Sequence, residues 1–580
     1  MVSVTCYKSC MADEKYFLEP MHDWQRRYEA LRASFVDRLP AKIVADRFGY
    51  SPAYVNLLRH QFSHDKIDFA EPVPEGKVNR RSVNMATRQK ICSWREHRLS
   101  AGEITQLLSE DGIELSVRTV ERVLSEEGYP KLPRRTRLKV GLTVQGARVP
   151  AVSKTLAIGG TLKVDCDSAG VFLFAPFIEK LNLAKVVADA GLPGTKMIPA
   201  LQYFLSFLAL KLIGTERFAH MNDHSFDAGL GVFAGLNVLP KCTAMSTYSY
   251  SLDAIHLQKL QSAFVRQANR IGLYDKRIIN LDFHTIPHFG DESVLQEHWA
   301  GARNKRMKGA LTLVGQDAGS KLILYTAADI QRLEADDQIL EFLAFWKKAQ
   351  RSVDPMLIFD SKFTTYANLS QLNAQGIKFI TLRRRGKKLI ERLDSINSWK
   401  RIHIPHAKRK YQNPQVFESM VELTGYNGIL RQIAMRGNGH QKPAFLISND
   451  MDAPVERIVG DYARRWRVEN VISEAVKFFN LNALSSPILT KVHFDVIMTM
   501  VADTLYSMLA SKLRGFEDCD AAKVFRHFVK GKGQVALSGE RLSVTFPRKA
   551  HNPILRNAPW HRLPKNISWL GDAKLELKFK

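Results

Sequence analysis

The chain has 580 residues, of which 45% are hydrophobic and 24% are charged, a composition that excludes a disordered or fibrous protein and predicts three or four folded domains. Lysine and arginine outnumber aspartate and glutamate by 84 to 58, which gives a formal net charge of +26. This charge favours a polyanionic partner, either nucleic acid or an anionic membrane face.

The six cysteines are too scattered for a zinc site or a disulfide framework. Only Cys6 and Cys10 lie close together, and no second pair follows them at a spacing typical of zinc ligands. We therefore expect reduced thiols in a cytosolic or nucleoid protein. The first thirty residues lack a signal peptide, and the apolar run Ile198–Ile213 is interrupted and too short to span a membrane, so we expect no membrane partner.

Residues 22–65 have the pattern of a first helix-turn-helix unit. Gly49 supplies a tight turn between two short amphipathic helices, and Ser51-Pro52 is a typical start for the second helix. A recognition helix presents its outward side chains to DNA bases. The candidate DNA-reading residues of this helix are Tyr54, Asn56 and Arg59.

Residues 85–130 repeat this pattern as a second helix-turn-helix unit. Gly112 supplies the turn and Ser116 is expected to cap the second helix. One such unit is common in any α-helical domain, but two in tandem in a basic chain favour DNA binding. Residues 131–150 then form a basic linker that either follows phosphates or is simply solvated. The candidate DNA-reading residues of the second unit are Arg118, Thr119 and Arg122.

A strand-rich segment follows a mainly helical domain, which we expect at residues 151–275 after a short strand at 171–174. Three short apolar runs come next, and a Gly-containing turn joins the last two as in a hairpin. The pattern then alternates helix, strand, helix, strand. These strands are expected at 277–283, 309–314, 321–325, 355–359 and 377–382.

This order of elements is typical of a ribonuclease-H-like core. Residues 384–448 interrupt it with many charges and short alternating runs, which predicts a β-rich insertion. A long helix is expected at about 453–480, and the apolar helix at 492–513 would support it. The predicted fold class is multidomain α/β: all-α helix-turn-helix units, then a mixed-sheet catalytic core at 276–383 and 449–513, the insertion, and a basic C-terminal tail with a hairpin at 514–580.

Three acidic residues stand at positions where such a core could bring them together. Asp282 lies in a buried-type strand, Asp360 follows the end of another, and Glu469 lies on the long helix. Carboxylates that share a cleft repel one another unless a cation is present, and their hard oxygens suit Mg²⁺ or Mn²⁺. Each acid could also have a purely structural role. Asp282 could be a strand-end hydrogen-bond acceptor, Asp360 a helix N-cap and Glu469 half of an exposed Glu–Arg pair.

Tyr462, Arg465 and Glu469 are spaced i, i+3 and i+7, which puts them on one face of the expected helix. With Leu281-Asp282-Phe283-His284 and Ile358-Phe359-Asp360-Ser361, they resemble DDE transposases of bacterial insertion sequences, in the branch with a Tyr-Arg-Glu-Lys signature. The resemblance covers roughly residues 275–510. It departs at the lysine, because Val476 stands seven residues after Glu469 and Lys477 comes one residue late.

The resemblance implies a DNA transposase that binds element ends, cleaves DNA strands and transfers them to target DNA. Asp282, Asp360 and Glu469 would be the catalytic residues and the ligands of two Mg²⁺ ions, or of Mn²⁺ in their place. Tyr462, Arg465 and Lys477 would contact DNA phosphate. The implied partners are double-stranded terminal repeats, target DNA and a second copy in a homodimer or higher multimer. The alternatives are a catalytically inactive, transposase-derived DNA-binding regulator and a nuclease with the same core.

Overall fold

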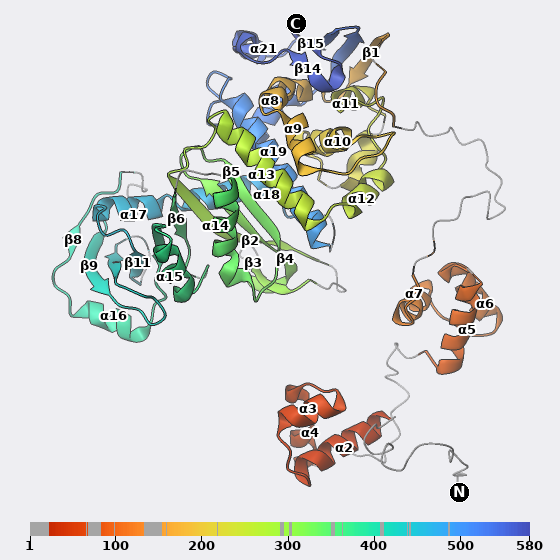
Figure 1. The fold of residues 1–580 in the computed structure, drawn as a ribbon, viewed down its shortest axis with the longest axis vertical. Coiled ribbons are helices and arrows are strands. Elements are labelled where there is room, and N and C mark those ends of the chain that lie inside the picture. The colour runs from red at the N-terminus through yellow and green to blue at the C-terminus, as the bar shows by residue number, and fades with distance from the viewer. Residues whose placement is uncertain are drawn as a thin grey trace. The chain divides into compact units, whose positions relative to one another are not determined.

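The computed structural model of the chain describes residues 22–64, 83–130 and 153–580, together with residues 67 and 132. Short gaps within these ranges fall at 98, 158, 217, 225, 290–294, 301–303, 350–353, 362, 406–410, 438, 440–441, 485 and 487. The predicted linker at 131–150 thus lies outside the described residues except for Leu132, as do Cys6 and Cys10. The chain divides into two compact units, residues 1–147 and 148–580 (Figure 1).

The first unit contains two small helical bundles, each with its own hydrophobic cluster. Gly49 ends the second helix of the first bundle in the left-handed conformation, with φ at 69°, and the hydroxyl of Ser51 accepts the backbone N–H of Tyr54. The predicted turn and cap are therefore confirmed. The helices are α2 (Asp23–Phe35), α3 (Ala41–Phe48), α4 (Pro52–Ser63), α5 (Met85–Glu96), α6 (Ala101–Glu110) and α7 (Val117–Glu126).

The predicted cap of the second bundle is also present, because the Ser116 hydroxyl accepts the backbone N–H of Thr119 at 3.2 Å. We expect Ser116→Ala to lower the local stability of α7 by about 1 kcal/mol, and Ser116→Gly to lower it by only a few tenths. Hydrogen exchange of the α7 amides in the full chain measures this. Equal protection in the parent and in Ser116→Ala would show that the cap does not stabilise the helix.

The second unit is built on a mixed sheet whose central strands run in the order β5-β4-β2-β6-β7. Strand β4 is antiparallel to β2 and to β5, whereas β6 is parallel to β2 and β7 is parallel to β6. This is the order of a ribonuclease-H-like core, so the predicted fold class is confirmed. The strands are β2 (Ile278–Pro287), β4 (Lys305–Asp317), β5 (Ile323–Ile330), β6 (Met356–Phe359) and β7 (Phe379–Leu382).

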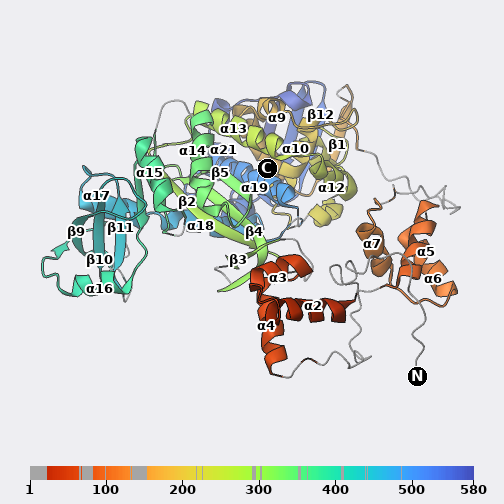
Figure 2. The ribbon, with the colours of Figure 1, turned by 60° about the horizontal axis from the view of Figure 1, so that its bottom comes forward.

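Residues 384–448 continue this sheet beyond β7. Strand β11 pairs antiparallel with β7, where Leu382 lies opposite Leu446, and the next strands follow in the order β10, β9, β8. In Figures 1 and 2 these strands lie at one end of the second unit, beside α17 (Val455–Ala463). The elements are α16 (Lys387–Asp394), β8 (Lys400–Arg401), β9 (Gln415–Val421), β10 (Leu430–Arg436) and β11 (Ala444–Ser448), and β3 (Glu297–Ala300) borders β4 at the other edge.

Residues 154–275 are mainly helical, and their buried side chains belong to the same hydrophobic cluster as the central sheet. Within this cluster α13 (Ala254–Arg270) and α10 (Ala200–Leu212) contact α19 (Leu489–Ala510). No helix among the described residues is long and apolar enough to cross a membrane. The remaining helices are α8 (Ala175–Lys180), α9 (Leu183–Ala190), α11 (Ala228–Phe233) and α12 (Cys242–Tyr250).

The strand predicted at 171–174 is wrong, because Ala169–Phe174 form a 3-10 helix. All six of these residues are buried, so the apolar run fills the core instead of joining a sheet. Gly170 permits this close packing, since a Cβ at this position would lie 2.2 Å from the carbonyl oxygen of Val529.

A second, five-stranded sheet joins the two ends of the second unit, in the order β1-β12-β13-β15-β14. Strands β12 and β13 form a hairpin, which confirms the hairpin predicted for the C-terminal tail. Strand β1 comes from much earlier in the chain and pairs antiparallel with β12, Thr161 opposite Ser538. The strands are β1 (Thr161–Cys166), β12 (Gly533–Ser538), β13 (Arg541–Phe546), β14 (Asn566–Ile567) and β15 (Ala573–Phe579).

Candidate active site

Neighbouring parallel strands deliver Asp282 and Asp360 to the same place on the central sheet. Strands β2 and β6 are in register up to the pair Asn280–Ile358, and each aspartate lies two residues beyond that pair. The strands share a direction, so both carboxylates emerge side by side where β6 ends. The Oδ1 of Asp360 accepts the backbone N–H of Ser361 at 2.6 Å.

The helix that carries the third acid is broken, and the single helix predicted from 453 to 480 is wrong. α17 ends at Ala463 and α18 (Trp466–Phe478) begins after Arg464-Arg465. The backbone N–H groups of Arg465 and Val468 donate to carbonyl groups three residues earlier, the spacing of a tightened turn. Tyr462 and Glu469 therefore lie on two successive helices, with Arg465 at the junction.

Arg465 links two of the three acids. Its Nη1 donates to Asp282 Oδ2 at 2.9 Å, and its Nη2 donates to Glu469 Oε1 at 2.8 Å. The side chains of Arg465 and Asp282 are 15% and 20% exposed, whereas that of Glu469 is 54% exposed. A guanidinium thus lies between a nearly buried carboxylate and one that faces solvent.

The charges of the other two acids act on Asp282. The pKa of Asp282 is raised to about 6, chiefly by burial, while Arg465 opposes this rise and the carboxylates of Glu469 and Asp360 add to it. Together with the strand register and the two contacts of Arg465, this groups Asp282, Asp360 and Glu469 in one acidic cluster.

Tyr462 lies against the same cluster from α17. Its ring centroid is 5.8 Å from the guanidinium carbon of Arg465. Burial raises the pKa of Tyr462 to about 12, although Arg465 opposes this rise. The phenol is therefore protonated at neutral pH and keeps a hydrogen to donate.

The donor set of this cluster fits divalent metal ions. Three carboxylates around one cation leave a net negative charge, and carboxylate oxygens are the ligands that Mg²⁺ and Mn²⁺ prefer. Among the described residues no three His, Cys, Asp or Glu side chains already stand at metal-ligand spacing. Arg465 instead holds two of the acids, so metal binding would require their side chains to turn.

Lys477 and His284 have other neighbours in the structure. Lys477 is exposed near the end of α18, where burial raises the pKa of Glu474 and the charge of Lys477 opposes this rise. His284 lies within 2.6 Å of the side-chain oxygen of Asn482, and burial lowers the pKa of its imidazole. Asn482 therefore satisfies this histidine.

The candidate DNA-reading residues fall into two groups. Asn56 and Arg118 are exposed. The other four also make contacts within their own bundles. In the first bundle the Tyr54 ring lies 5.0 Å from that of Tyr50, and Arg59 donates to the Leu39 carbonyl at 2.7 Å. In the second, Thr119 hydrogen-bonds the Ser116 hydroxyl at 2.9 Å, and Arg122 lies 3.6 Å from Glu126.

Sequence reasoning missed Arg384. It lines a cavity of about 260 Å³ together with Asp360, Thr364 and Tyr366. The chain reaches this cavity because β6 and β7 are parallel, so the residues after each strand emerge at the same edge. The run of three arginines directly after the predicted strand at 377–382 is the signal that could have found it.

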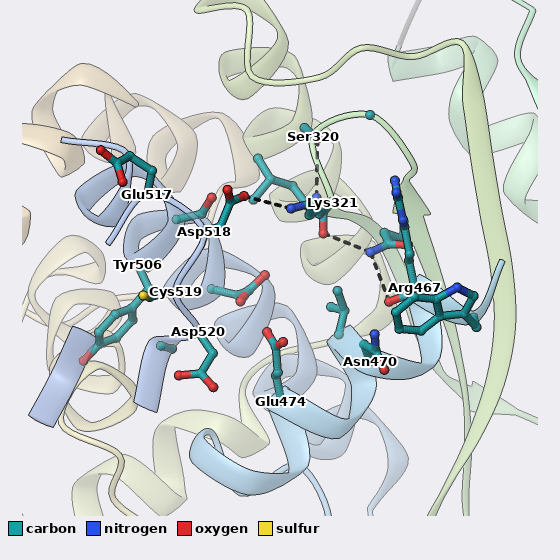
Figure 3. Close-up of a pocket in the computed structure, with 18 residues that line it drawn as sticks. Ser320, Lys321, Arg467, Asn470, Glu474, Tyr506, Glu517, Asp518, Cys519 and Asp520 are labelled. Atoms are coloured by element: carbon teal, nitrogen blue, oxygen red, sulfur yellow. Dashed lines mark hydrogen bonds and ion pairs between the residues drawn. The ribbon is translucent and has the colours of Figure 1, made fainter. Parts of the chain in front are cut away.

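A separate acidic cavity of about 550 Å³ lies along α18 and is lined by none of the three clustered acids. Figure 3 shows Glu474, Asp518 and Asp520 around it, with Lys321 paired to Asp518 at 2.9 Å. Asp503 of α19 also lines this cavity. Burial, with a smaller contribution from the charge of Glu474, raises the pKa of Asp503 to about 7.

This shift predicts a pH-dependent stability. The folded protein retains the Asp503 proton up to about pH 7, whereas the unfolded chain loses it near pH 4, so stability falls as the pH rises between these values. We expect Asp503→Asn to remove this loss. Its stability gain over the parent should be about 2 kcal/mol greater at pH 8 than at pH 5.5 in denaturant unfolding. An equal gain at both pH values would contradict the assignment.

Part of the chain is similar to a known protein family. Residues 273–503 match the family model described as "Transposase DDE domain". Comparison with curated proteins gives no match. Among solved structures, the "Crystal structure of the Mos1 Strand Transfer Complex" is 11% identical, with a TM-score of 0.13 over 63% of this chain and 78% of that one, a similarity too low to support an argument. Residues 273–503 of this chain are thus similar to the transposase DDE domain.

Proposed function

We propose that this protein is a DNA transposase that binds element ends and catalyses metal-dependent strand cleavage and strand transfer. The observation that carries the proposal is the contact of Arg465 with both Asp282 and Glu469, next to Asp360, inside a transposase DDE domain. An arginine between two acids also occurs in ordinary structural networks. Here the strand register adds the third carboxylate at the same sheet edge.

In this proposal Asp282, Asp360 and Glu469 hold two Mg²⁺ ions, or Mn²⁺ in their place. Such ions, when bound, activate the attacking oxygen and stabilise the leaving oxygen of a phosphodiester. The chain's own contribution is position and charge. The sheet fixes two of the ligands, while α18 supplies the third from a different element and thus closes one side of the site.

Arg465 and Tyr462 would position the DNA phosphate. The Nε of Arg465 is buried and has no hydrogen-bond partner among the described residues, so a turn of this side chain on DNA binding would give a phosphate oxygen an unused donor. The protonated phenol of Tyr462 provides a second donor beside it. Phosphoryl transfer needs little more from a protein than such positioning and charge stabilisation.

The two helical bundles of the first unit would recognise the element ends. Asn56 and Arg118 are the exposed candidates for base contacts. Synapsis of two ends also requires more than one copy of the chain, so we propose a homodimer or higher multimer on DNA.

A strand-cleavage assay on the DNA that flanks the coding sequence tests the proposal. We expect nicks at the element ends in Mg²⁺ or Mn²⁺ and none in a chelator. Sequence-specific binding without any nicking would instead identify a DNA-binding regulator. Nicks that are never joined to a second DNA would identify a nuclease.

A further inference from the structure

The C-terminal sheet has one buried and one exposed face. In β13 the side chains of Leu542 and Val544 are buried, whereas Arg541 is exposed. In β15 Leu575 is buried and its neighbour Lys574 is exposed. The sheet therefore packs its apolar side chains inward and presents charges on the other face.

Two cations stand side by side at one end of this face, because Arg541 and Lys574 are register partners on the parallel strands β13 and β15. Lys574 also lies opposite Asn566 of β14, and a third cation, Lys565, directly precedes Asn566. Like charges opposite one another on neighbouring strands cost stability. Among the described residues, none of the three forms an ion pair with an acidic side chain. The nearby Glu576 pairs instead with Lys578, at 3.2 Å.

These cations line a cleft of about 380 Å³. One wall is aromatic: Trp560 borders the cleft, and its indole N–H donates to the Leu555 carbonyl at 2.6 Å, which fixes the ring. The surrounding segment is basic as well, because residues 533–580 contain nine lysines and arginines against three aspartates and glutamates. The cleft thus places three cations beside one carboxylate, that of Glu576, on a preformed concave surface.

We propose that this basic cleft, formed by Arg541, Lys565, Lys574 and Trp560, binds the phosphate backbone of duplex DNA. Arg541 and Lys574 lie on adjacent strands, about 4.8 Å apart, and Lys565 lines the same cleft, so the cations are spread along the cleft and suit a line of phosphates better than one small anion. The cleft belongs to the same compact unit as the transposase DDE domain. This binding surface is additional to the helix-turn-helix units and the acidic cluster, and it does not require the chain to cleave DNA.

The test is a salt titration of DNA binding with the charge-reversed full chain. Fluorescence anisotropy would follow a duplex unrelated to the element ends, in the absence of divalent ions. We expect Arg541→Glu/Lys574→Glu to bind at least about tenfold more weakly than the parent at moderate salt. The slope of log affinity against log salt should fall by about two, the value for two lost phosphate contacts.

The matched control is Lys185→Glu, a charge reversal on α9 of the same unit, at a residue paired with Asp189 at 2.8 Å. It should leave affinity and slope near those of the parent. Lys574→Glu alone places opposite charges on register partners, so its melting temperature should not fall and misfolding cannot explain weaker binding.

Two results would overturn the proposal. One is an unchanged affinity and salt slope in the double variant. The other is an equal loss in Lys185→Glu, which would show a general effect of net charge. Competition by inorganic phosphate distinguishes a DNA surface from a site for small anions. If the cleft binds phosphate but the double variant keeps full duplex affinity, the cleft is a small-anion site.

Discussion

Glu469→Gln is expected to abolish strand cleavage and to leave DNA binding intact. The side chain of Glu469 is 54% exposed, so an amide of the same shape disturbs no packing. It does remove one negative charge and one hard oxygen ligand from the acidic cluster. We expect the single-turnover cleavage rate to fall by on the order of 10³-fold. Asp360→Asn should have an effect of the same size.

Glu474→Gln provides a matched control for this experiment. It makes the same chemical change on the same helix, at an exposed residue outside the acidic cluster. Its cleavage rate should stay within a few-fold of the parent rate. Comparable loss in both variants would mean that α18 itself, and not the Glu469 carboxylate, is what cleavage requires. Normal cleavage by Glu469→Gln would remove Glu469 from the catalytic site.

Arg465→Ala is expected to destabilise the metal-free protein and to make its stability depend strongly on Mg²⁺. The substitution leaves Asp282 without its cation, 20% exposed and beside two other acids. The free energy of unfolding should fall by about 2–3 kcal/mol. Added Mg²⁺ should then recover more stability than it adds to the parent, because no internal cation competes for the carboxylates. Denaturant unfolding with and without Mg²⁺ measures both effects.

Arg464→Ala separates this effect from the loss of any arginine at the helix junction. Arg464 lies 3.3 Å from Asp461, whose side chain is 8% exposed, so its removal should also cost stability. That loss should not respond to Mg²⁺, because Asp461 lies outside the acidic cluster. If Mg²⁺ restores both variants equally, or neither, then Arg465 does not occupy the place of a metal ion.

The positions of Asp282 and Asp360 could be predicted because the signals are local. Each aspartate belongs to a short apolar run, and the alternation of strands and helices around them is typical of parallel pairing. The register of β2 and β6 follows from that topology. The caps at Ser51 and Ser116 were predictable for the same reason, because each depends on residues three positions away.

The break between α17 and α18 could not be predicted from the sequence. Ala463-Arg464-Arg465-Trp466 contains no glycine or proline, and each residue tolerates a helix. Arg465 at this break pairs with Asp282, which is 183 residues earlier in the chain. Local propensity carries no information about such a partner. The spacing of Tyr462, Arg465 and Glu469 thus selected residues that lie near one another, although the helix that carries them is not continuous.

The five-stranded C-terminal sheet was only partly predictable. Its hairpin was visible as two alternating runs near the chain end. Strand β1 was not, because its partner lies 377 residues away, where Thr161 and Ser538 share a hydrogen bond at 3.2 Å. The basic cleft likewise brings Arg541, Lys574 and Lys565 together only when β13, β15 and β14 become neighbours. In the sequence these cations are separated single charges.

The most direct test of the central claim is a strand-transfer assay with a pre-cleaved end. The full chain would be mixed with an end duplex that carries a free 3′-hydroxyl, supercoiled plasmid and Mg²⁺. We predict a joined product that requires the divalent ion and is lost in Glu469→Gln but not in Glu474→Gln. The absence of joining by the parent chain, or joining that persists in Glu469→Gln, would contradict the assignment of Asp282, Asp360 and Glu469 as a transposase active site.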